Sequence, residues 1–199
     1  MKIILFDFDG VIADTYSFCY RIISSNEALT HDEYKARFEG NINDAIRKIG
    51  QDTKRIDFWG EYEPELMKCQ PNTELTNMIQ QLSKDHVLII ISSTISLPIK
   101  KFLDIYELSS CFKEILGNDV EKSKIKKIQD VLERYYIKPE EAVFITDTLG
   151  DIKEAKKCGV ESIAVTWGYH PRKTLQKGNP RIIINHPSEL IKAIGTFES

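Results

Sequence analysis

Short runs in which apolar residues fill nearly every position recur along the chain, and they constrain its fold more than any other feature. Five runs are strong and rich in isoleucine and valine, and a sixth, weaker run lies between the second and the third. The strong runs are residues 2–6, 87–91, 142–146, 162–166 and 181–184, and the weak one is 114–116. Strands that are apolar on both faces are typical of a covered, parallel sheet.

Helical periodicity fills much of the sequence between these runs. Residues 73–84 place apolar side chains on one stripe, and residues 124–136 do the same after Ser123, a good N-cap residue. Residues 150–158 also read as a helix, which Gly159 would end. The alternation of strands and helices predicts an α/β fold with a Rossmann-like, doubly wound and mainly parallel sheet.

One segment directly after the first run breaks the alternation. It contains no strand-like run but several helix signals, among them a capping box formed by Thr30 and Glu33 and a helical pattern beginning at Asn43. We therefore expect a small helical cap inserted after the first strand. The expected domains are a catalytic core of residues 1–14 and 71–199 and a cap of residues 15–70.

Composition excludes several classes of protein. The 199 residues are 42% hydrophobic, which is enough to bury the core of one domain with an insertion. With 27 basic and 30 acidic residues, the net charge of −3 gives no strong field toward nucleic acid or an anionic membrane. Asp7 interrupts the apolar N-terminus, and no segment approaches 18 apolar residues, so we expect neither a signal peptide nor a membrane span.

The four cysteines favour a reducing compartment. They are widely spaced and form no CxxC pair, which argues against both a zinc site and a disulfide framework. We expect a cytoplasmic protein that binds neither nucleic acid nor membranes.

Acidic, hydroxyl and basic residues cluster where three of the predicted strands end. In an open α/β sheet, ligands bind outside the carboxyl ends of the strands. We therefore expect these side chains to converge in one crevice. They are Asp7 and Asp9 after the first run, Ser92, Ser93 and Thr94 after the second, Asp147 and Asp151 after the run at 142–146, and Lys122 and Lys124 at the start of the preceding helix.

Four carboxylates in one crevice require a compensating positive charge. A hard cation with oxygen ligands meets this need, and Mg²⁺ is the natural choice, because no histidine or cysteine adjoins these strand ends to favour zinc. With the cation bound, one aspartate could attack a phosphoryl group. A second aspartate two residues later could protonate the leaving oxygen.

These segments resemble the haloacid dehalogenase-like hydrolase superfamily, in its phosphoglycolate phosphatase-like branch with a helical cap. "DFDGVIAD" at 7–14 matches the first motif, DxDG(T/V), and "DTLGD" at 147–151 matches the fourth, DxxxD. "IISS" at 90–93 resembles the second motif, and "VTWGYH" at 165–170 resembles the segment after the fifth strand. The resemblance covers nearly the whole chain, and the first and fourth motifs together make it specific.

The resemblance implies a Mg²⁺-dependent phosphatase of small phosphate monoesters that works through an aspartyl-phosphate. Asp7 would be the nucleophile, and Asp9 would act first as the general acid and then as the base. Ser92, with Ser93 beside it, and a lysine would bind the phosphoryl group. The implied metal site consists of Asp7, the backbone carbonyl of Asp9, Asp147 and the supporting Asp151.

Two details of the motifs stand apart from this pattern. Thr146 precedes Asp147, where the family commonly has glycine. The third-motif lysine has two candidates, because the spacing of a Lys-Pro motif selects Lys122 whereas a lysine that opens the helix selects Lys124. Ser123 as the N-cap would place Lys124 in the first turn and favours it.

Other functions share part of this pattern. A sugar phosphomutase of the same family carries all four motifs and remains an alternative. From a different class, a non-catalytic phospho-ligand-binding or signalling protein could use the fold, although the intact carboxylate set argues against lost turnover. A dehalogenase is disfavoured because Asp9 supplies an acid that displacement of an alkyl halide does not need.

Overall fold

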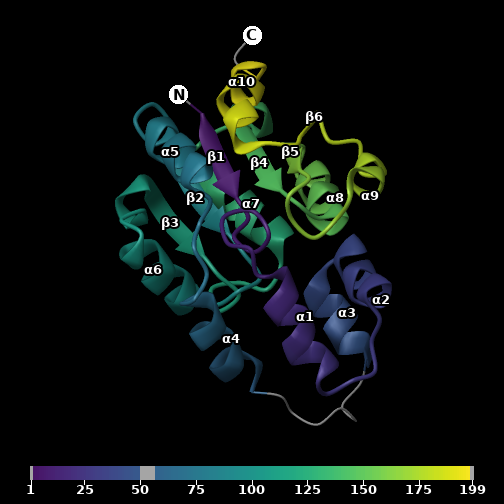
Figure 1. Ribbon diagram of the computed structural model, residues 1–199. Coiled ribbons are helices and arrows are strands. Elements are labelled where there is room, and N and C mark those ends of the chain that lie inside the picture. The colour runs from purple at the N-terminus through teal and green to yellow at the C-terminus, as the bar shows by residue number, and fades with distance from the viewer. Residues whose placement is uncertain (1, 50–56, 198–199) are drawn as a thin grey trace.

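The computed structural model describes residues 2–49 and 57–197 (Figure 1). Within them lies a six-stranded sheet with the strand order β3-β2-β1-β4-β5-β6, and all five neighbouring pairs are parallel. The expected Rossmann-like α/β fold is confirmed. The strands are β1 (Ile3–Phe6), β2 (Val87–Ile91), β3 (Phe112–Leu116), β4 (Ala142–Thr146), β5 (Glu161–Val165) and β6 (Ile182–Ile184).

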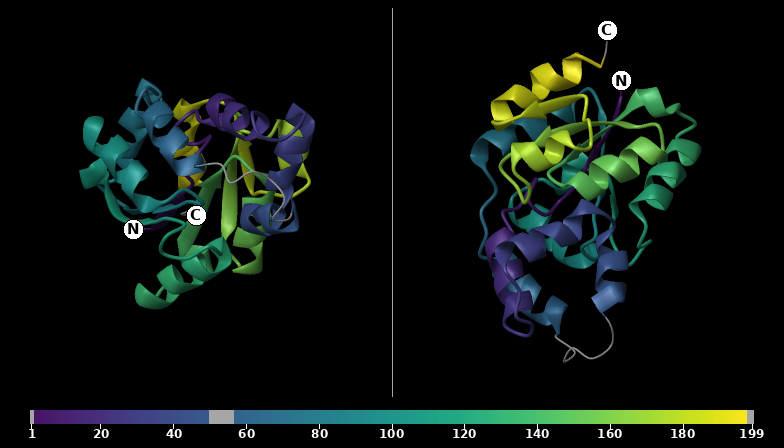
Figure 2. Two further views of the ribbon diagram at one scale, coloured as in Figure 1. Left: turned by 90° about the horizontal axis from the view of Figure 1, so that it is seen from below. Right: turned by 90° about the vertical axis from the view of Figure 1, so that its right-hand side faces the viewer.

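Each apolar run of the sequence forms one of these strands. Alternate residues of β1 enter opposite layers of the core: Ile4 and Phe6 belong to one hydrophobic cluster, and Ile3 and Leu5 belong to another. Helices cover both faces of the sheet (Figure 2), which explains why the central strands β1, β2 and β4 have no polar face. Strand β1 lies at the centre, and Phe6 pairs with residues of both β2 and β4.

The core helices follow the expected pattern in part. Helices α5, α7 and α8 correspond to the predicted segments, and Gly159, with φ of +74°, ends α8. The sequence patterns do not predict helices α6, α9 and α10. Helix α6 contains Pro98 in its first turn, where backbone N–H groups have no partner within the helix, so the proline costs no helical hydrogen bond. The helices are α5 (Thr73–Leu82), α6 (Ser96–Ile105), α7 (Lys124–Arg134), α8 (Leu149–Lys157), α9 (Arg172–Gln176) and α10 (Leu190–Gly195).

Four helices of the described chain lie between β1 and α5, and Figure 1 shows them at the carboxyl ends of the strands. The expected capping box is present, since Thr30 and Glu33 bond each other's backbone at the start of α2. We propose that these helices form the cap expected for residues 15–70. They are α1 (Tyr16–Ser24), α2 (His31–Ala36), α3 (Ile42–Ile49) and α4 (Phe58–Leu66). Gly50, the expected end of α3, lies outside the described residues.

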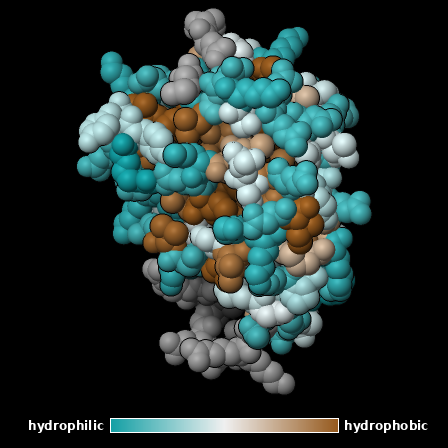
Figure 3. Space-filling model, turned by 90° about the vertical axis from the view of Figure 1, so that its left-hand side faces the viewer, coloured by the Kyte–Doolittle hydropathy of each residue, from teal (hydrophilic) through white to brown (hydrophobic). Residues whose placement is uncertain are grey.

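Short 3₁₀ turns connect several elements: η1 (Arg37–Glu39), η2 (Ser109–Cys111), η3 (Pro139–Glu141) and η4 (Pro187–Glu189). Apolar side chains reach the surface on the side that carries α6 and the edge strand β3 (Figure 3), including Leu97 and Ile105 of α6. Scattered exposure of this kind is ordinary in folded proteins. No helix among the described residues has the length and apolarity needed to cross a membrane.

Candidate active site

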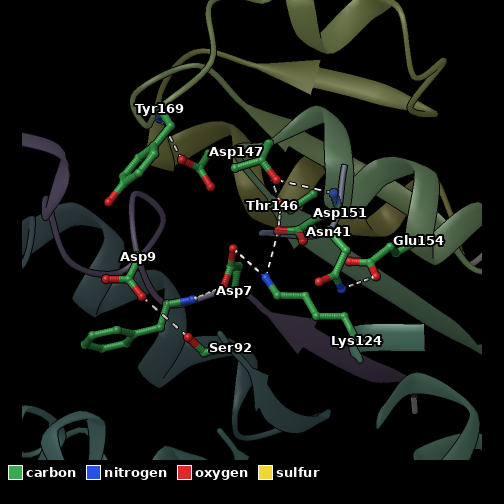
Figure 4. A network of polar contacts seen from close by, with 12 residues as sticks. Asp7, Asp9, Asn41, Ser92, Lys124, Thr146, Asp147, Asp151, Glu154 and Tyr169 are labelled. Carbon is green, nitrogen blue, oxygen red and sulfur yellow. Dashed lines mark hydrogen bonds and ion pairs between the residues drawn. The ribbon is translucent and has the colours of Figure 1, made fainter. Parts of the chain in front are cut away.

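Asp7 directly follows β1, extends its pairing with β4 by one residue and is the first residue of the site. Its N–H donates to the carbonyl of Ile145 at 2.9 Å, so the parallel ladder with β4 fixes its backbone. The side chain is buried, and its Oδ1 accepts a hydrogen bond from the N–H of Phe8 at 2.8 Å. Its Oδ2 lies 2.9 Å from Nζ of Lys124 (Figure 4). Asp7 is therefore a fixed carboxylate against a buried ammonium.

Lys124 joins Asp7 to a second carboxylate. Its Nζ donates to Oδ2 of Asp151 at 2.8 Å, and the Thr146 hydroxyl donates to the same oxygen at 2.8 Å. Thr146, the residue that departs from the family's usual glycine, thus helps to hold Asp151. The first turns of α7 and α8 bring Lys124 and Asp151 together beside the end of β1.

The structure distinguishes the two candidate lysines by position. Ser123 is the N-cap of α7, with its side chain accepting a bond from the N–H of Lys126, and this places Lys124 in the first turn, inside the site. Lys122 is exposed, and its backbone carbonyl accepts a bond from the side chain of Asn43 at 3.0 Å. Lys124 is therefore the lysine that the fold brings to Asp7.

Asp147 is fully buried at the end of β4. Its Oδ2 accepts the N–H of Tyr169 at 2.6 Å, while its Oδ1 is buried with no hydrogen-bond partner among the described residues. Two glycines make room for this carboxylate, because a Cβ on Gly10 would lie 2.1 Å from Asp147 Oδ2 and one on Gly168 would lie 2.2 Å from it. The glycine of the first motif is thus required by the carboxylate of the fourth.

The carboxylate of Asp9 turns toward hydroxyl groups. Oδ1 accepts a bond from the Tyr62 hydroxyl at 2.7 Å, and Oδ2 accepts one from the Thr94 hydroxyl at 2.6 Å. The Ser92 hydroxyl lies 3.5 Å from the same Oδ2. Tyr62 belongs to α4, whereas Thr94 and Ser92 follow β2, so Asp9 is held between the proposed cap and the core.

Ser92 is buried at the end of β2, and its hydroxyl oxygen accepts the N–H of Thr94 at 3.0 Å. Its backbone carbonyl accepts a bond from Nζ of Lys127 at 2.6 Å, and this lysine also reaches the carbonyl of Leu116 at 3.2 Å. Ser93 is only partly buried. The ends of β2 and β3 are thus joined by a second buried lysine of α7.

The three buried carboxyl groups of this part of the site differ in pKa. Burial raises the pKa of Asp7 well above its usual value, and the charges of Asp151 and Asp147 add to this effect, whereas Lys124 opposes it. Burial raises the pKa of Asp147 to about 7. Burial also acts against ionisation of Asp151, but Lys124 and its hydrogen bonds hold that pKa below the usual value. The single positive charge of Lys124 therefore does not offset the negative charge that these three buried carboxyl groups would carry if all were ionised.

The oxygen donors of this site fit a hard divalent cation. The unpartnered Oδ1 of Asp147 and the raised pKa of Asp7 both mark a local lack of positive charge. Among the described residues, no three acidic, histidine or cysteine side chains form a metal-binding group, so the expected metal site stays a prediction. Hydroxyl groups contact the Asp9 side chain, and Lys124 contacts Asp151.

The proposed cap touches the core beside this site. Asn41 donates to Oε1 of the buried Glu154 on α8 at 2.8 Å (Figure 4). The carbonyl of Gly40 approaches Gly150 so closely that a Cβ there would lie 2.3 Å from it. The segment after α2 is therefore seated directly on the first turn of α8, next to Asp151.

Sequence reasoning missed Tyr62 and Lys127, and it placed Thr94 near the site without indicating its contact with Asp9. Thr94 belongs to the polar group after β2, but its bond to Asp9 has no separate signal. Tyr62 reads as an ordinary apolar residue of a helix, and nothing local indicates that its hydroxyl reaches 53 residues back to Asp9. Lys127 lies three residues after Lys124, a helical spacing that could have suggested a second inward lysine.

The comparisons agree with this geometry. The model of the family described as haloacid dehalogenase-like hydrolase matches residues 4–165. A phosphoglycolate phosphatase of Aquifex aeolicus is 27% identical over 207 residues, which cover 96% of both chains, and one of Synechococcus elongatus is 24% identical over 206 residues, which cover 98% of this chain and 97% of the relative.

Solved structures share the fold over nearly the full length. A predicted phosphatase from Clostridium acetobutylicum has a TM-score of 0.80 at 20% identity, with 97% of each chain covered. A haloacid dehalogenase-like hydrolase from Streptococcus pneumoniae has a TM-score of 0.78 at 19% identity, with 98% of each covered. The family-model match over residues 4–165 shows that the chain belongs to the haloacid dehalogenase-like hydrolases.

Proposed function

We propose that the protein hydrolyses small phosphate monoesters with the aid of Mg²⁺, by way of an aspartyl-phosphate on Asp7. One observation carries the proposal: Asp7 and Asp9 leave the same central strand, yet the first faces the Lys124 ammonium and the second faces hydroxyl groups. A nucleophile and a proton carrier need these different surroundings.

The first half of the reaction would transfer the phosphoryl group to the enzyme. A carboxylate oxygen of Asp7 attacks phosphorus, and the bond from phosphorus to the leaving oxygen breaks. The protonated Asp9 gives its proton to that oxygen, and the alcohol departs. Lys124, which contacts Asp7, and the Ser92 hydroxyl, which lies near Asp9, would bind the phosphoryl oxygens as these gain negative charge.

The second half would return the enzyme to its starting state. Asp9, now a carboxylate, takes a proton from a water molecule whose oxygen attacks phosphorus. The bond from phosphorus to Asp7 breaks, inorganic phosphate leaves, and Asp9 is protonated again. Asp151 contacts Lys124, so its part would be to keep that ammonium in place.

The metal would be held by the carboxylates of Asp7 and Asp147 and by the backbone carbonyl of Asp9. Bound there, Mg²⁺ supplies positive charge that offsets the repulsion between a carboxylate nucleophile and a phosphate dianion. Asp147 suits this role because one of its oxygens is buried without a partner among the described residues.

The substrate would be a compact metabolite rather than a polymer. Both relatives described above are named phosphoglycolate phosphatase, which makes phosphoglycolate the first ester to test. The helices α1–α4 lie over the carboxyl ends of the strands, and a cover of this kind leaves room for a small molecule and keeps bulk water out.

Turnover assays test the proposal. We expect the purified protein to hydrolyse p-nitrophenyl phosphate with Mg²⁺, to stop in EDTA and to recover when Mg²⁺ is restored, while the larger and more loosely coordinated Ca²⁺ supports little activity. Phosphoglycolate should then release inorganic phosphate. Full activity in EDTA would contradict the metal, and conversion of a hexose 1-phosphate to the 6-phosphate would instead identify a mutase.

A further inference from the structure

Tyr62 brings a hydroxyl group from α4 into the active site. Its side chain is about as buried as any in the protein, with 1% of its surface exposed. The ring packs against Phe18, Phe58 and Trp59, with centroid distances of 5.4, 5.6 and 5.6 Å. These contacts come from the helices between β1 and α5, so the ring is fixed within the proposed cap while its hydroxyl donates to Asp9.

The two oxygens of the Asp9 carboxylate have donors from different parts of the fold. Tyr62 donates to Oδ1 from α4 at 2.7 Å, and Thr94 donates to Oδ2 from the core at 2.6 Å. A carboxylate with hydroxyl donors on both oxygens cannot rotate about its side-chain bond without losing contacts on both sides. Its orientation therefore depends on α4 staying docked against the core.

An ion pair beside Tyr62 supports this docking. Glu63, the next residue of α4, lies 2.5 Å from Nζ of Lys101 on α6. The pair is partly exposed, so its own contribution to stability is small, but it joins α4 to α6 at the residue next to Tyr62. Tyr62 and Glu63 together make α4 the part of the proposed cap that meets the Asp9 side of the site.

We propose that Tyr62 is a positioning residue: its hydroxyl holds Asp9 in place, so that protonation of the leaving group requires α4 to be docked. The inference rests on the proposed function, in which Asp9 is the general acid. When α4 moves away to admit a substrate, Asp9 loses one of its two donors. When α4 returns, Tyr62 restores the carboxyl orientation at the moment the active site closes.

Removing the hydroxyl should therefore affect esters according to their need for a proton. Tyr62→Phe keeps the ring and its packing but leaves Asp9 with Thr94 as its hydroxyl partner. The readout is the rate of the phosphoryl-transfer step, measured by burst kinetics, because the later hydrolysis of the aspartyl-phosphate is common to both esters. We expect the transfer rate for an alkyl phosphate to fall about tenfold, a fraction of what general acid catalysis supplies, because its leaving oxygen needs a proton. The transfer rate for p-nitrophenyl phosphate, whose leaving group needs little protonation, should change less than about twofold.

The matched control is Tyr20→Phe. Tyr20 lies on α1, is half-buried, and donates its hydroxyl to the carbonyl of Leu29 at 2.7 Å, away from Asp9. This variant loses the same chemical group from the same set of helices. We expect it to leave the ratio of the two transfer rates unchanged. Circular dichroism and the melting temperature of each variant check the fold.

A double-mutant cycle keeps the test decisive even if Tyr62→Phe is less stable. In an Asp9→Asn background, Tyr62→Phe should have almost no further effect on the alkyl phosphate, because the group that Tyr62 positions no longer carries a proton. An equal loss of the transfer rate for both esters, a loss that persists in the Asp9→Asn background, or an alkyl phosphate transfer rate unchanged from the wild type would overturn the inference. A wild-type protein inactive on both esters would instead overturn the proposed function.

Discussion

Asp7 and Asp9 are separated by one residue, yet the protein holds them by opposite means. Asp7 is buried against an ammonium and belongs wholly to the core, where β1, α7 and α8 meet. Asp9 is partly exposed and accepts bonds from neutral hydroxyls, among them that of Tyr62 on α4. One half of the site is therefore set by charge pairing, and the other by hydrogen bonds that depend on α4.

The backbone explains how close neighbours reach such different surroundings. In a continuing strand, residues 7 and 9 would project from the same face of the sheet. The ladder ends at Asp7, and the chain then turns: the carbonyl of Phe8 accepts the N–H of Ile12 at 2.8 Å, and Gly10 has φ of +74°. The turn separates the two side chains, and this separation gives each carboxyl its own chemistry.

The largest expected effect comes from the charge-paired half. Asp7→Asn keeps the size of the side chain but removes the nucleophile, so kcat for p-nitrophenyl phosphate should fall by about 10³-fold or more. The loss should be similar for alkyl phosphates, because both esters need the same attack on phosphorus. Steady-state assays with both substrates measure it, and wild-type-like turnover would contradict the mechanism.

The hydroxyl-bonded half should respond differently. Asp9→Asn removes the proton that the leaving oxygen needs, so alkyl phosphates should lose on the order of 10²- to 10⁴-fold. For p-nitrophenyl phosphate, the transfer step should suffer much less. Burst kinetics, which separate release of p-nitrophenol from release of phosphate, measure that step. An equal loss of the first step for both esters would remove the distinction between the two aspartates.

The sequence was sufficient for the parts of this comparison that depend on strand ends. The apolar runs predict the strands. The rule that ligands bind outside the carboxyl ends of parallel strands predicts that Asp7, Asp9 and Asp147 lie at one edge of the sheet. The sequence does not predict hydrogen-bond partners that come from distant segments. Tyr62 lies on a helix whose apolar pattern explains the burial of its ring but not the contact of its hydroxyl with Asp9. Local patterns record which residues are buried, whereas the contacts that orient them depend on packing between elements.

The two candidate lysines of the third motif test the half of the site in which Asp7 is paired with an ammonium. Lys124→Ala should reduce kcat/KM by about two orders of magnitude, which is roughly 3 kcal/mol and typical of a preorganised charge in a desolvated site. Lys122→Ala serves as the control, because Lys122 is exposed and its loss should change the rate little. Activity lost in Lys122→Ala and kept in Lys124→Ala would reverse the assignment made from geometry.

The smallest expected effect concerns a contrast within α7. Lys124 and Lys127 lie one turn apart and are both buried, but Lys124 faces carboxylates whereas Lys127 donates to two backbone carbonyls. Charge attraction from Asp151 and Asp7 overcomes burial and raises the pKa of Lys124. Burial, together with repulsion from Lys124, lowers the pKa of Lys127 to about 8.

The lowered pKa of Lys127 predicts how stability changes with pH. Between about pH 8 and the usual lysine value of about 10.4, the unfolded chain holds more protons at this position than the folded chain, so this group's contribution to the free energy of unfolding rises with pH. Below pH 8 the unfavourable burial of the ammonium acts in full. The melting temperature of the wild type, relative to Lys127→Met, should therefore increase between pH 7 and pH 10.

Differential scanning calorimetry at the two pH values measures this change, and a shift of several degrees is expected, since 1 kcal/mol corresponds to roughly 2–4 °C for a chain of this size. Lys126→Met, exposed on the same helix, controls for the loss of one positive charge from the whole protein. The comparison between variants cancels the titration of all other groups. If the melting temperature of the wild type does not rise relative to that of Lys127→Met between pH 7 and pH 10, burial does not destabilise the Lys127 ammonium. Lys124 and Lys127 would then differ in their contacts but not in their pKa shifts.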